Sequence, residues 1–95
     1  MKYADFMSSL SSDAPPADIS RESTALWLEK NGDWDEAHTI VQDIPQALGS
    51  AVHAYLHRKE GDLGNAGYWY RRAGRAEFSG SLDEEWDSLV KEIFG

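Results

Sequence analysis

Apolar residues recur at intervals of three and four positions over most of the chain, and no stretch alternates convincingly between apolar and polar residues. Intervals of three and four place side chains on one face of an α-helix, whereas alternation is typical of a half-buried β-strand. The two clearest stripes are Ala37, Ile40, Val41 and Ile44, and then Leu82, Trp86, Leu89, Val90 and Ile93. The pattern therefore predicts an all-α fold.

Start and stop signals divide residues 20–95 into about five helices, which we assign to a single compact domain. The helices are expected to begin near Ser20, Asp33, Pro45, Asp62 and Ser81. Serine and aspartate favour the N-cap because their side chains accept a hydrogen bond from a free backbone N–H of the first turn. Glycines at positions 32, 61 and 74 mark helix ends, since glycine tolerates the left-handed conformation found there.

Residues 1–19 are expected to lie outside this domain, as a short helix followed by a proline-rich linker. Apolar residues occur at helical spacing between Tyr3 and Leu10. A helix of this length is marginal alone, so it must either dock on the domain or fray. Pro15 and Pro16 then prevent a helix from continuing.

An internal repeat is visible at an offset of 29 residues, where Gly32-Asp33 and Ala37 correspond to Gly61-Asp62 and Ala66. Each unit is predicted to be a helix, a tight turn and a second helix that carries a small residue at one fixed place. The pattern resembles helix-hairpin repeats of the tetratricopeptide type, although that family has a period of about 34 residues. We therefore predict a bundle that contains two repeat-like helix-turn-helix hairpins.

Three longer strings carry a closer resemblance: WDEAHTIVQ (34–42), HAYLHRKEGDLGNAGYWYRRAGR (53–75) and SLDEEWDSLV (81–90). They resemble a family of small bacterial proteins of uncharacterised activity, and the likeness covers roughly residues 22–94. The resemblance implies a compact helical fold and a cytoplasmic location. It implies no activity.

Composition narrows the classes of partner. The 95 residues carry a formal net charge of −8, from 17 acidic and 9 basic side chains. This balance argues against nucleic acid and anionic membranes as partners, because lysine and arginine provide most of the attraction to phosphate. The chain has no cysteine, which excludes disulfides and thiolate metal ligands. No apolar run is long enough for a signal peptide or a membrane span, so we expect a cytoplasmic protein.

The main functional hypothesis is a helical interaction module whose surface lies on the third and fourth helices. Residues 58–75 hold five basic side chains against two acidic ones, in an otherwise acidic chain. The residues expected to contact a partner are His53, His57, Tyr68, Arg71, Arg72 and Arg75. The partner would be a protein or a small acidic ligand, since arginine can form two parallel hydrogen bonds to one carboxylate. A structural alternative is that these arginines only pair with nearby acidic residues, and a homodimer is a third alternative.

A second hypothesis is a metal site formed by His38, His53 and His57. His53 and His57 are four residues apart, so they share one face of a helix, and His38 on the neighbouring helix adds a third imidazole. Such a set could hold zinc or another divalent metal. Ala54 stands where the metalloprotease motif has glutamate, so that motif is absent. Ring nitrogens that converge to within about 4–5 Å would favour a metal site, and divergent rings would favour the interaction module.

Two further patterns are weaker. The three histidines lie among many carboxylates and could act as acids or bases, but no nucleophile occupies a recognisable elbow, so an enzyme is the less favoured hypothesis. Gly61, Gly64 and Gly67 form a G-x-x-G-x-x-G string without the G-x-G spacing of a dinucleotide site. Close helix packing or room for a bound partner would each explain the last two glycines.

Overall fold

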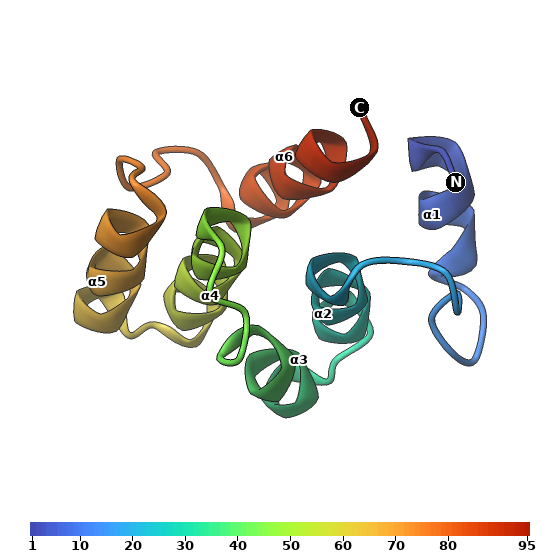
Figure 1. The fold of residues 1–95 in the computed structure, drawn as a ribbon, viewed down its shortest axis with the longest axis horizontal. Coiled ribbons are helices and arrows are strands. Elements are labelled where there is room, and N and C mark those ends of the chain that lie inside the picture. Colours follow the sequence, from blue (N-terminus) through green and yellow to red (C-terminus); the bar gives the residue numbers. More distant parts are fainter.

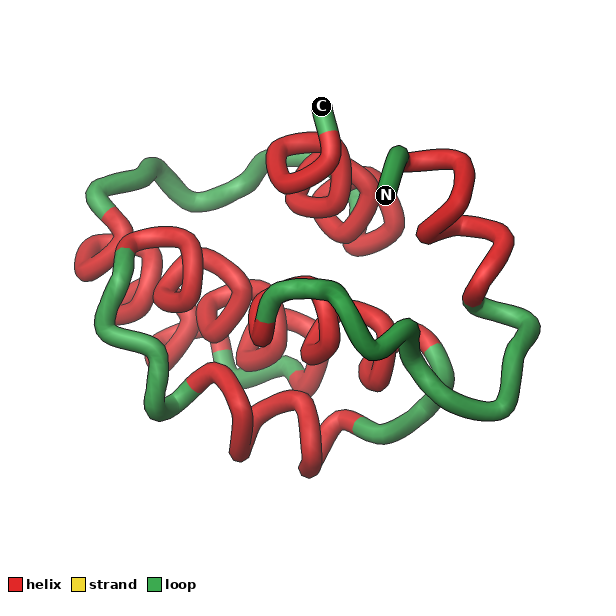
Figure 2. The backbone as a smooth tube through the Cα atoms, turned by 45° about the vertical axis from the view of Figure 1, so that its right-hand side comes forward, coloured by secondary structure: helices red, strands yellow, loops and turns green.

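The computed structural model describes residues 1–95 and contains six α-helices and no β-strand (Figures 1 and 2). This confirms the predicted all-α class. The helices are α1 (Tyr3–Ser9), α2 (Arg21–Lys30), α3 (Trp34–Val41), α4 (Ala47–Glu60), α5 (Leu63–Ala73) and α6 (Leu82–Phe94). None of them combines the length and the apolar character that crossing a membrane requires.

Helix α4 lies at the centre and contacts α2, α3, α5 and α6. Helices α2 and α3 form one antiparallel pair, and α4 and α5 form the next, so that α5 lies at one edge of the molecule (Figure 1). Helix α6 packs across α2 and α4, which joins the two pairs. This arrangement places one face of α4 directly against α3.

The two hairpin turns have the same local geometry. Gly32 and Gly61 adopt left-handed backbone conformations, with φ of +93° and +90°, which a residue with a side chain rarely adopts. The aspartate that follows each glycine caps the next helix: Asp33 accepts a hydrogen bond from the N–H of Glu36, and Asp62 accepts one from Asn65. The resemblance of these hairpins to a repeat family stays a prediction.

The turn between α3 and α4 extends slightly past the predicted helix start near Pro45. Helix α3 already ends at Val41, and α4 begins only at Ala47. Pro45 disfavours helical geometry at the preceding Ile44, whose side chain is buried in the core. A Cβ atom on Gly49 would collide with Ile44, so the turn folds tightly onto the first turn of α4.

Helix α1 is docked on the domain, the first of the two alternatives left open for this short segment. Phe6 is fully buried, and its ring centroid lies 4.9 Å from that of Phe94 and 6.2 Å from that of Trp86. Docking on α6 stabilises a helix that is too short to be stable alone. Six helices therefore pack together, five of them the predicted helices and the sixth this short N-terminal one.

A buried polar network connects α4, α5 and α6. The carboxylate of Glu85 is buried. It accepts hydrogen bonds from Arg58 Nη1 at 2.8 Å and from the Tyr70 hydroxyl at 2.5 Å. The second Arg58 nitrogen, Nη2, donates to the carbonyl of Gly80. Because a buried charge is costly without partners, this network fixes the position of α4 relative to α6.

Candidate metal centre

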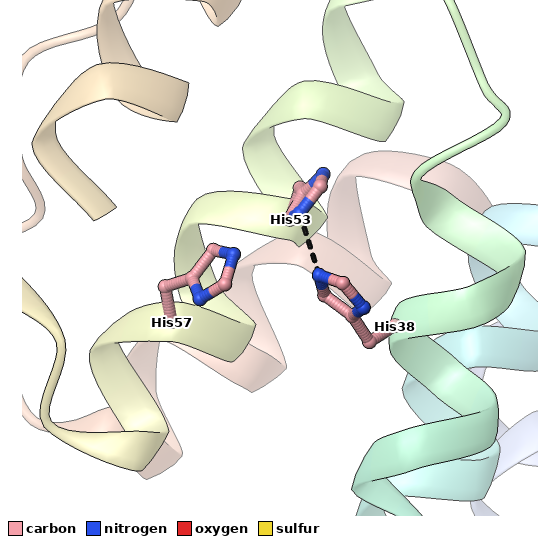
Figure 3. Close-up of side chains that lie close together, drawn as sticks. All are labelled: His38, His53 and His57. Carbon is pink, nitrogen blue, oxygen red and sulfur yellow. Dashed lines mark hydrogen bonds between the residues drawn. The ribbon is translucent and has the colours of Figure 1, made fainter. Parts of the chain in front are cut away.

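All three histidines of the chain meet at the interface between α3 and α4 (Figure 3). His38 comes from α3, and His53 and His57 come from successive turns of α4. One ring nitrogen of each histidine lies within 4.8 Å of one from each of the other two. The convergence that distinguishes a metal site from an exposed interaction surface is therefore present in the structure.

Two of the three imidazoles are in direct contact. The Nε2 atoms of His38 and His53 are 3.0 Å apart, so one of them donates its proton to the other (Figure 3). His53 is only 3% exposed, and its Nδ1 has no hydrogen-bond partner. Leaving a buried polar atom unpaired costs about 1–3 kcal/mol. The cluster therefore retains unsatisfied bonding capacity at its most buried residue.

The third imidazole is oriented by a carboxylate. His57 Nδ1 lies 2.7 Å from Oε2 of Glu60, one turn further along α4. This contact occupies Nδ1 and leaves Nε2 as the nitrogen available to a ligand. Metal-binding histidines commonly donate their other N–H to a carboxylate in this way, which fixes the tautomer and the ring orientation.

Tryptophans from two helices hold the rings in place. Trp34 stacks on His38 with ring centroids 5.0 Å apart and an interplanar angle of 8°. Its indole N–H donates to the carbonyl of Leu56 at 2.7 Å, which anchors α3 on α4. Trp69 of α5 stacks on His53 with centroids 3.8 Å apart and an angle of 16°. The imidazoles are thus confined on two sides by rigid aromatic rings.

The surroundings disfavour the charged form of two imidazoles. Burial, followed by the proximity of His38 and His57, lowers the pKa of the His53 imidazole to about 3. Burial and the neighbouring His57 also lower the pKa of His38, although Glu60 and Asp35 oppose that change. A neutral imidazole has a free lone pair, which is the form that binds a metal ion.

A second group of side chains adjoins the cluster. His57, Glu60 and Asp62 offer ligand atoms that lie within 4.8 Å of one another. These groups already have structural partners, because Glu60 bonds His57 and Asp62 caps α5. The geometry therefore assigns Glu60 to the support of His57.

Some of the residues predicted to contact a partner are exposed in the structure, and others are buried. Tyr68, Arg71 and Arg72 are exposed on α5. His53 and His57 are buried, at 3% and 6% exposure, which corrects their assignment to an exposed surface. Arg75 is half-buried and pairs with Glu92 of α6, Nη1 to Oε1 at 2.8 Å. The histidines face α3 instead of solvent because α3 packs on that side of α4.

Two contributors to the site were not predicted as such. Neither Trp34 nor Trp69 was among the residues predicted to form it. The interval from Trp34 to His38 is four residues, which places both on one face of α3. That spacing is the sequence signal that links Trp34 to the histidine, whereas the stacking of Trp69 depends on how α5 packs against α4.

The fold and the site together define a small helical protein with a buried three-histidine cluster. Comparison with protein-family models, with curated proteins and with solved structures finds no match to this chain.

Proposed function

We propose that this protein binds one zinc-class divalent metal ion through His38, His53 and His57. The observation that carries the proposal is the convergence of all three histidines of the chain, from two helices, to mutual ligand-atom distances within 4.8 Å. His38 is half-buried, while the other two are buried, so an ion would reach the cluster from the His38 side.

The spacing of the ligand atoms suits a small ion. Zinc–nitrogen bonds of about 2.0–2.1 Å in tetrahedral geometry place neighbouring ligand nitrogens about 3.3 Å apart. The His38 and His53 Nε2 atoms are 3.0 Å apart, so a small movement of one ring would admit the ion. In the complex, the metal would replace the proton that these two nitrogens share.

The donor set also limits the class of metal. Three imidazoles suit zinc, copper, nickel and iron, whereas magnesium and calcium prefer oxygen ligands. Three protein ligands leave a fourth tetrahedral position for water or another small ligand. With no cysteine in the chain, the copper and zinc sites built on thiolates are excluded.

Calorimetric titration with zinc tests the proposal. We expect one ion per chain, bound with a dissociation constant of micromolar or below, and no comparable heat from magnesium. The net charge of −8 could attract cations weakly, so Asp83→Asn, which removes an exposed carboxylate, is the control and should bind zinc as the wild type does. Absence of binding at micromolar zinc would refute the proposal.

Replacement of Glu60 by glutamine should weaken zinc binding about 10–100-fold, the usual effect of losing a carboxylate that supports a metal-bound histidine. The amide can still accept from His57 Nδ1 but carries no charge. The measurement is a competition titration against a zinc chelator, with Glu77→Gln as a matched exposed control. Equal affinities for the two variants would show that Glu60 does not support the site.

A further inference from the structure

The outer side of α5 is exposed along most of the helix. Helix α5 packs mainly on α4, bonds α6 through the Tyr70 hydroxyl, and lies at the edge of the fold (Figure 1). Apart from Leu63 at its start, the exposed residues of this helix fall on one side: Gly64, Asn65, Tyr68, Arg71 and Arg72. The positions 64, 68 and 72 are spaced by four residues, so they form a continuous stripe along the helix.

The charge of this face is opposite to that of the whole chain. Helix α5 is the only helix without an aspartate or glutamate, in a protein of net charge −8. Neither Arg71 nor Arg72 lies within 4.0 Å of a carboxylate. Salt screens charges beyond about 8 Å under physiological conditions, so a docked partner would respond to these two guanidinium groups more than to the net charge.

Gly64 provides an independent observation. A Cβ atom at Gly67 would lie 3.2 Å from Glu77 Oε2, so internal packing accounts for that glycine. A Cβ atom at Gly64 would meet nothing within 4 Å, so no contact inside the chain requires a glycine there. Glycine weakens a helix relative to alanine, and its use on an open face allows another backbone to approach closely.

Aromatic and cationic groups are already arranged on the same stripe. Tyr68 is 45% exposed, one of three large apolar side chains with such exposure. Arg72 donates to the Tyr68 hydroxyl at 3.3 Å and lies over the Trp69 ring at 5.3 Å. These contacts hold an arginine and a tyrosine side by side before any partner binds, and both residue types dominate protein interfaces.

From these observations, we propose that the stripe Gly64–Tyr68–Arg72, with Arg71 beside it, docks a glutamate-rich helix of a partner protein. The partner's carboxylates would pair with the two arginines, and its backbone would cross α5 at Gly64. The proposal concerns a different face from the metal centre and does not depend on metal binding.

The test is an NMR titration of the full chain with a short alanine-rich helical peptide that carries a stripe of glutamates. Backbone shifts are expected to centre on Gly64, Tyr68 and Arg72. Arg72→Glu should weaken binding at least about tenfold by reversing one interfacial charge. Arg21→Glu, the same change at an exposed arginine of α2, should leave the affinity within about twofold.

A second variant separates binding from folding. Gly64→Leu should leave the melting temperature unchanged or raise it by about 3–6 °C, since leucine favours helices and a Cβ atom at this position meets no neighbour. It should weaken binding of the peptide about tenfold. The proposal is overturned if Gly64→Leu destabilises the fold. It is equally overturned if the shifts are absent or centre elsewhere, if a glutamine-substituted peptide binds as well, or if only a DNA oligonucleotide binds.

Discussion

Zinc at a free concentration one hundred times its dissociation constant is expected to stabilise the folded protein by about 2.7 kcal/mol, because the ion binds only the native arrangement of the three histidines. For a domain of this size, that free energy raises the melting temperature by roughly 10–20 °C. The measurement is thermal unfolding followed by circular dichroism, with and without zinc, and with a chelator added to reverse the effect.

His53→Gln is the informative variant for this prediction. His53 contacts His38 and stacks on Trp69, so its loss removes a ligand from the centre of the cluster. The substitution will itself change stability, and the comparison is therefore the zinc-induced shift within each protein. The shift should fall to less than about 2 °C in the variant, since two remaining imidazoles bind zinc far more weakly than three. An equal shift in both proteins would place the ion elsewhere.

The second large effect concerns the buried network that positions α4. Arg58→Met should lower the free energy of unfolding by about 3–5 kcal/mol, because it leaves the charge of Glu85 buried without its cation. The Arg58 Nη1 to Glu85 Oε1 distance is 2.8 Å, and the carboxylate side chain is 4% exposed. The hydrogen bond to Glu85 is the largest cause of the raised pKa of Arg58. Urea unfolding measures the loss.

Two further variants identify the cause of that loss. Arg58→Met combined with Glu85→Gln should recover more than half of the lost stability, since the amide can still accept from Tyr70 and no charge remains buried. Arg75→Met breaks a comparable pair with Glu92 whose side chains are 35% and 42% exposed. This substitution should lower the free energy of unfolding by only about 0.2–1 kcal/mol. If both arginine variants cost the same, burial is not the source of the effect.

Local features of the fold could be predicted from the sequence. Ser20, Asp33, Asp62 and Ser81 each cap the helix that the pattern indicated, and each accepts a hydrogen bond from the backbone of the first turn. Such caps depend on side chains that bond within three residues, so the sequence contains the whole interaction. The same holds for His53 and His57, whose spacing alone places them on one face of α4.

The sequence pattern could not predict contacts between residues that lie far apart along the chain. Arg58 and Arg75 were counted in the basic segment 58–75, and the carboxylates that pair with them are 27 and 17 residues away. His38 reaches the other histidines because the turn at Ile44 and Pro45 folds α3 onto α4. The burial of Glu85, in the first turn of α6, likewise depends on Arg58 and Tyr70 arriving from two other helices. Each case requires the packing of helices, which periodicity does not specify.

The most direct test of the metal centre is a zinc titration of the histidine side-chain nitrogen signals by NMR. The chain has three histidines, so every imidazole can be followed. The account predicts that all three change together and saturate at one equivalent of zinc, with His57 bound through Nε2 and protonated at Nδ1 beside Glu60. An imidazole that does not respond, or saturation only at a large excess of zinc, would contradict it.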